Sequence, residues 1–106
     1  MGSPDYFNYV PKSEYIFTDE DYGKPISERL SEILRRNASK DDLANIAIKC
    51  KVSFSTIRDV VYRTNSLTKA NATAIAQLIY VAFENSIGYK IRSETDVMFL
   101  EELLNF

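Results

Sequence analysis

The chain has 106 residues, of which 45% are hydrophobic and 26% charged, with a formal net charge of −2. This length and composition are those of one globular domain with a single core, and no apolar run reaches the roughly 20 residues of a membrane-spanning helix. Because Cys50 is the only cysteine and the N-terminus lacks the blocks of a signal peptide, disulfides within the chain are excluded and we expect a cytoplasmic protein.

Residues 1–23 are rich in aromatic and acidic side chains and predict an N-terminal arm or hairpin. One interpretation is a small β-ribbon, with short strands at 6–10 and 15–17 on either side of a turn. The other is an irregular arm packed across the domain. In either case we expect the acidic run Asp19–Asp21 to fold back on a basic face and lower its affinity for partners.

Helices dominate the rest of the chain. Ser39 followed by Asp42 has the pattern of a capping box, and Ser53 is a favourable N-cap. The spacing of apolar residues predicts four helices, at 26–37, 40–50, 54–62 and 68–86.

The C-terminal segment predicts a fifth helix. Gly88 interrupts the preceding pattern, and 89–92 alternates as a short strand does. A final helix is expected from Glu94, with Ser93 as its cap. Residues 24–106 are therefore expected to form a mostly α-helical bundle of about five helices with a C-terminal extension.

The charges of the chain are distributed unevenly. Residues 24–71 carry ten Lys and Arg against five Asp and Glu, a net +5, whereas residues 1–23 carry −4 and residues 72–106 carry −3. A basic centre between acidic flanks is typical of a domain that presents one face to nucleic acid. The plainer interpretation is that these charges occupy solvated faces.

Residues 43–62 have the pattern of two short helices joined by a tight turn. Ala47 is small enough for a second helix to cross above it, and Ser53 opens that helix. The apolar residues that would hold the two helices together are Ile46, Cys50, Val52, Ile57 and Val60.

This pattern resembles the helix-turn-helix of the lambda-repressor-like (Cro/repressor-type) DNA-binding family. The resemblance continues without a gap through 65–76, and it implies a sequence-specific, repressor-like regulator of transcription that binds double-stranded DNA, commonly as a dimer. Two glycines of the family pattern are replaced, by Lys51 in the turn and by Arg63 after the second helix. A residue other than glycine at a position with positive φ costs on the order of 1 kcal/mol, and Arg63 is expected to lengthen the second helix or change its exit.

In this family the second helix lies in the major groove, so the outward side chains of 54–62 become candidate base contacts. Arg58 matches the O6 and N7 atoms of guanine, whereas Asp59 repels phosphate unless it accepts from cytosine or orients Arg58. The candidate base contacts are Phe54, Ser55, Arg58, Asp59 and Tyr62. The candidate phosphate contacts are Lys40, Lys49, Lys51, Arg63 and Lys69. The alternative for each is an ordinary surface position, and for Phe54 a core contact.

Other functions find less support in the sequence. Histidine is absent, and neither a metal-ligand cluster nor a glycine-rich phosphate loop occurs, so we expect no enzyme, metal or cofactor. Cys50 lies on an apolar stripe and is expected to be a core residue. The leucine-rich C-terminal edge is either core cover or a dimer surface. The main alternative function is a protein–protein interaction module on the same scaffold, antitoxin-like or adaptor-like, that does not bind DNA directly.

Overall fold

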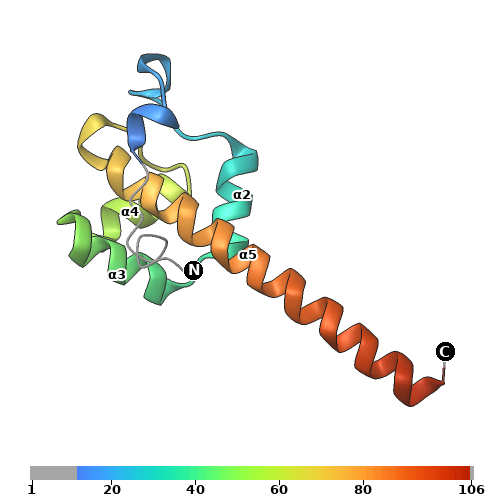
Figure 1. Ribbon diagram of the computed structural model, residues 1–106. Helices are drawn as coiled ribbons and strands as arrows, with labels where there is room; N and C mark the ends of the chain where they lie inside the picture. The colour runs from blue at the N-terminus through green and yellow to red at the C-terminus, as the bar shows by residue number, and fades with distance from the viewer. Residues whose placement is uncertain (1–11, 106) are drawn as a thin grey trace.

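The computed structural model describes residues 12–105, and within them the secondary structure is entirely helical (Figure 1). Two short 3-10 helices come first and four α-helices follow. The elements are η1 (Ser13–Tyr15), η2 (Asp19–Asp21), α2 (Glu28–Asn37), α3 (Lys40–Cys50), α4 (Phe54–Val61) and α5 (Lys69–Leu104). None of the four is long and apolar enough to cross a lipid bilayer.

The first half of α5 forms the centre of the core. It contacts α2, α3, α4 and η1, so these four elements pack on it. Ile57 of α4 and Ile75 and Leu78 of α5 are completely buried, and Leu34 of α2 is 1% exposed. Burial of such side chains contributes about 1.5–3 kcal/mol each, which makes this cluster the main source of stability.

Side-chain caps fix where the helices begin. Ser39 accepts a hydrogen bond from the Asp42 amide, and the Asp42 carboxylate accepts one from the Ser39 amide, so the predicted capping box is confirmed. Ser53 caps α4 by accepting from the Thr56 amide, also as predicted. Each such cap contributes about 1 kcal/mol.

The helix predicted at 26–37 begins two residues later than expected. Ser27 accepts a hydrogen bond from the Leu30 amide and therefore serves as the N-cap of α2. Ile26 lies before this cap but is still buried in the core. The amphipathic pattern thus identified the correct face, while the cap set the boundary.

The predicted β-ribbon is wrong in the part that the structure describes. Tyr15 lies in η1 instead of a strand, because the Tyr15 amide donates to the Lys12 carbonyl and the Phe17 amide donates to the Ser13 carbonyl. Phe17 is buried in the core, so this segment packs on the domain as the alternative interpretation had it. The other predicted strand, at 6–10, lies outside the described residues.

The break at Gly88, the strand at 89–92 and the separate final helix are also wrong, because α5 continues without interruption from Lys69 to Leu104. The bundle therefore has four α-helices in the described chain instead of about five. A glycine inside a helix costs only about 0.5–1 kcal/mol, and no proline occurs in this stretch to remove a backbone donor. A cost of this size is too small to end a helix of 36 residues.

The distal half of α5 extends away from the body of the protein (Figure 1). The radius of gyration is 16.6 Å, whereas a compact domain of this length has about 13 Å. The protein is thus a small helical body with one long helical arm.

Candidate functional site

A tight turn joins α3 to α4. Lys51 ends α3 in the left-handed conformation, with φ of 58° and ψ of 39°, and its amide donates to the Ala47 carbonyl. The Val52 amide donates to the same carbonyl at 3.2 Å. The positive φ at Lys51 is where the resemblance to glycine-containing turns predicted it, and only residues 51–53 separate the two helices.

The faces of α4 differ sharply. Ile57, Val60 and Val61 point into the core and are at most 2% exposed. The opposite face is polar and accessible: Ser55, Arg58 and Tyr62 are exposed, while Phe54 and Asp59 are partly buried. Ser55, Arg58, Asp59 and Tyr62 therefore lie towards solvent, whereas Phe54 also packs against the core, as the alternative interpretation of this residue expected.

Arg58 and Asp59 interact with each other on this face. The Arg58 Nε and Nη2 atoms donate to the same Asp59 carboxylate oxygen at 3.2 and 3.1 Å. Both side chains are about half exposed, 50% and 41%. An exposed pair of this kind contributes at most about 1 kcal/mol, so an approaching charged partner can replace it.

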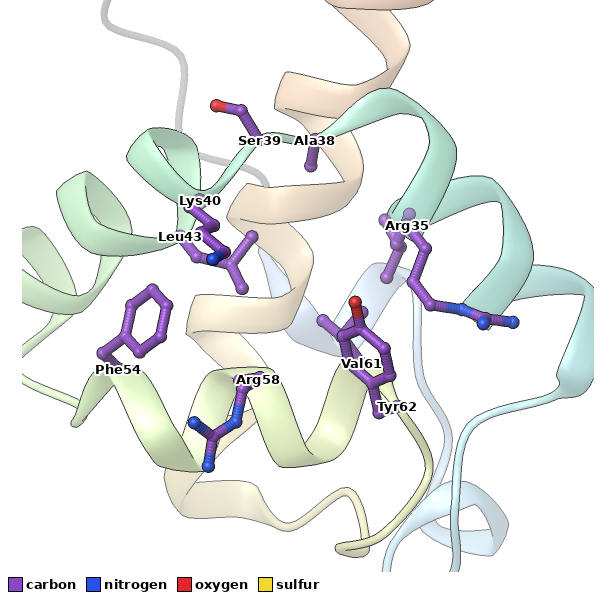
Figure 2. Close-up of a pocket in the computed structure, with 10 residues that line it drawn as sticks. Arg35, Ala38, Ser39, Lys40, Leu43, Phe54, Arg58, Val61 and Tyr62 are labelled. Atoms are coloured by element: carbon purple, nitrogen blue, oxygen red, sulfur yellow. The ribbon is translucent and has the colours of Figure 1, made fainter.

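A pocket of about 230 Å³ lies beside this face, between α4, the end of α2 and the start of α3. Figure 2 shows Phe54, Arg58 and Tyr62 following one another along α4, with Lys40 and Arg35 contributed by the neighbouring helices. The Arg35 guanidinium lies over the Tyr62 ring, 5.5 Å from its centroid. The pocket has an apolar floor and three cationic side chains around it.

Arg35 was not among the candidate residues from the sequence. The available signal was the basic pair at the C-terminal end of α2, where lysine and arginine are common because they complement the helix dipole. Only the packing of α2 beside α4 brings Arg35 to Tyr62, and that proximity is a property of the tertiary structure.

The candidate phosphate-binding residues occupy different places. Lys40 lines the pocket, and Lys49 and Lys51 are exposed near the end of α3. Arg63 instead turns towards α2, because its Nε donates to the Ile26 carbonyl at 2.7 Å and its Nη1 lies 3.6 Å from the Glu28 carboxylate. Of these basic residues, Lys40 lies beside α4 and Lys49 and Lys51 lie near the end of α3, whereas Arg63 is held by contacts with Ile26 and Glu28.

Arg63 also shows how α4 ends. Its φ is 65°, which stops the helix at Val61 instead of lengthening it. The helix is therefore not lengthened, and Arg63 adopts the left-handed conformation in which a glycine commonly ends a helix, so neither expectation for this position is confirmed.

Lys69 lies with the acidic N-terminal segment. Its Nζ is 5.9 Å from the centre of the Tyr22 ring, and the two residues line one hollow together with Asp19. Asp21 is engaged locally, accepting from the Thr18 amide at 2.7 Å. The acidic run therefore lies at the start of α5, while the pocket beside α4 is lined by other residues.

Cys50 is half-buried at the end of α3 and packs against the core. Burial raises the pKa of its thiol, and the neighbouring Lys49 charge opposes this rise only in part. A raised pKa lowers the thiolate population, as expected for a structural cysteine. Within residues 12–105 no group of His, Cys, Asp and Glu side chains is arranged to hold a metal ion.

Comparisons of the chain with protein-family models, curated proteins and solved structures found no match.

Proposed function

We propose that the protein binds double-stranded DNA as a regulator of transcription, with α3 and α4 as a helix-turn-helix of the lambda-repressor type. In this arrangement α4 lies in the major groove, whose width accommodates one α-helix. The observation that carries the proposal is the division of α4 into a fully buried apolar face and an outward face with Ser55, Arg58 and Tyr62.

The turn geometry supports the same proposal. In helix-turn-helix proteins the first helix holds the second at a fixed angle, so the junction must be short and well ordered. Lys51 adopts the positive φ that a glycine normally supplies there, and Ser53 caps α4. The replacement of glycine is thus compatible with the turn, at a cost in backbone strain.

The exposed residues divide into two roles. Arg58, once released from Asp59, would offer a planar pair of donors to a guanine, while Phe54, Ser55 and Tyr62 would contact neighbouring bases or sugars. Lys40 supplies charge beside α4 and would contact phosphate, which orients the domain but carries no sequence information.

Arg35 extends this cationic surface. Its guanidinium packs on the Tyr62 ring and remains exposed, so it lies beside the same groove-facing helix. We assign Arg35 a phosphate contact in addition to the lysines identified from the sequence.

The experiment that tests the proposal is selection from a random-sequence duplex library, with affinity measured as salt is varied. DNA binding through these cations predicts a steep fall in affinity with salt and enrichment of a short sequence element. If no binding is detected at about 50 mM salt, where non-specific affinity is strong, the proposal fails and the protein–protein module becomes the better assignment.

A further inference from the structure

In the part of the chain that the structure describes, most of the exposed large hydrophobic residues lie in the distal half of α5. Among the described residues fourteen large hydrophobic side chains are exposed, and ten of them lie between Phe83 and Leu104. A high density of large exposed apolar side chains on one element indicates an interaction site.

One face of this arm continues the face that α5 buries in the core. Ile75, Leu78 and Ala82 are between 0% and 3% exposed. With 3.6 residues per turn the same side of the helix returns near residues 89, 93, 97, 100 and 104. We call these positions the distal stripe: Tyr89, Ser93, Val97, Leu100 and Leu104.

The large side chains of the distal stripe are accessible in the single chain. Tyr89 is 67% exposed, Leu100 53% and Leu104 61%. The core-forming pattern of α5 thus extends well beyond the body that it stabilises, and its outer part needs a partner.

The charges of the arm indicate what that partner is. Its two basic residues, Lys90 and Arg92, lie towards the body, whereas Glu101 and Glu102 lie near the tip. Lys90 and Glu101 are eleven residues apart, about three helical turns, so they lie on the same side of the helix. The basic and acidic ends of the arm therefore complement each other when a second arm runs in the reverse direction, with Glu94 and Asp96 lying between the two ends.

We propose that two copies of the protein associate through the distal stripes of α5 in an antiparallel pair. In this arrangement Lys90 of each copy lies near Glu101 of the second copy, and Tyr89 lies near Leu104 of the second copy. A parallel pair would instead place the acidic tips side by side, where like charges repel. This association involves no residue of α4, so it stands or falls separately from DNA binding.

The first test is the molecular mass of the full chain in solution, measured by sedimentation equilibrium over a wide concentration range. The proposal predicts a dimer, and Leu100→Asp converts it to a monomer of half that mass. Met98→Asp is the matched control, because Met98 is 67% exposed and lies across the helix from the stripe. Its dimer should persist, while far-UV circular dichroism shows both variants to be folded.

Two results would overturn the proposal at this stage. One is a monomeric full chain at every concentration, which would mean that the arm serves another protein or folds back on its own body. The other is equal dissociation of the Leu100→Asp and Met98→Asp variants, which would exclude the distal stripe as the interface.

The second test concerns orientation and uses charge reversal. Lys90→Glu and Glu101→Lys, made singly, each place like charges together in an antiparallel pair and should raise the dimer Kd about tenfold. The double variant restores the opposite charges and should return to within a few-fold of the wild type. Unchanged affinity in both single variants, or no recovery in the double variant, would rule out the antiparallel arrangement.

Discussion

The hydroxyl of Ser31, in the middle of α2, donates a hydrogen bond to the backbone carbonyl of Val61 at the end of α4. Both residues are buried, at 2% exposed each. A helix ends with carbonyls that lack a partner within the helix, and here a side chain from another helix supplies one. The bond fixes the C-terminal end of α4, and with it Tyr62, against α2.

Removing this hydroxyl should destabilise the fold. Ser31→Ala leaves the buried Val61 carbonyl without this donor, and an unsatisfied buried group costs about 1–3 kcal/mol. Urea denaturation followed by circular dichroism measures the change in the free energy of unfolding. Ser86→Ala is the control, because Ser86 is exposed and bonds only along its own helix, to the Phe83 carbonyl. Equal stability of the two variants would contradict the role given to Ser31.

The left-handed conformation of Lys51 predicts a stabilising substitution. Lys51→Gly removes the steric cost of positive φ and should raise the free energy of unfolding by up to about 1 kcal/mol. Arg63→Gly is a matched comparison, since Arg63 also has positive φ but holds the Ile26 carbonyl. The free energy of unfolding of Arg63→Gly should therefore rise less than that of Lys51→Gly, or fall. Thermal unfolding of both variants measures this difference. An equal gain in the two variants would mean that backbone strain alone determines the effect and that the Arg63 hydrogen bond contributes nothing.

Base preference should depend on Arg58. Arg58→Ala is expected to cost about 1–3 kcal/mol on the preferred sequence and to relax selection at one position of the site. Lys40→Ala is the matched phosphate-contact variant, and should weaken binding to all sequences and reduce the salt slope by about 1. Fluorescence anisotropy on selected and scrambled duplexes distinguishes them. Equal losses on both duplexes for Arg58→Ala would contradict a base contact.

The continuity of α5 through Gly88 can be tested directly. Gly88→Ala should stabilise the arm by about 0.5–1 kcal/mol, because alanine is the better residue inside a helix. The added methyl has room, since the nearest atom, Nη1 of Arg92, would be at 3.4 Å, an ordinary contact distance. Hydrogen exchange of residues 89–104 should slow relative to the wild type. Faster exchange would indicate that the chain bends at Gly88.

Cys50 should react slowly in the folded protein. Because burial raises the pKa of its thiol, the thiolate fraction near neutral pH is smaller in the folded state than in the unfolded state. Iodoacetamide should therefore modify the native protein more slowly than the protein in urea. Lys49→Gln should slow the native reaction further, since the Lys49 charge lowers this pKa. A native rate equal to the rate in urea would show that the thiol is freely accessible.

The same shift has a consequence for stability. A group whose pKa is raised on folding favours the folded state below its unfolded pKa, and this contribution disappears as the pH rises through the folded pKa. Unfolding free energy should therefore fall on the alkaline side, and less so in Cys50→Ala. No difference between the two proteins in alkaline buffer would mean that Cys50 does not contribute.

The features that sequence predicted correctly are local. The caps at Ser39 and Ser53 depend on side chains within three residues of the amides they bind, so the pattern alone identifies them. The buried positions of α4 follow from helical periodicity in the same way. Positive φ at Lys51 was predicted from the resemblance instead, because Lys51 occupies the position of the turn glycine in the helix-turn-helix pattern.

The features that sequence missed depend on distant contacts or on a small balance of energies. Arg35 joins the candidate site only because α2 packs against α4, an arrangement that the Ser31–Val61 bond helps to fix. At Gly88 a cost of about 1 kcal/mol had to be weighed against the preferences of a whole helix. A single glycine does not show from the sequence whether the helix continues through it, so two helices were predicted where one exists.

Because α5 is one unbroken helix, it fixes the angle between the outward face of α4 and the distal stripe. Each residue of an α-helix advances the side chains by about 100°, so the number of residues between the core and the arm sets the angle at which the distal stripe faces. Inserting one residue after Ser86 would rotate the distal stripe by about 100° relative to the body. Inserting eleven residues, about three full turns, would return the stripe almost to its present orientation. The orientation of the distal stripe relative to α4 thus depends on the number of residues in α5 between the core and the arm, whatever those residues are.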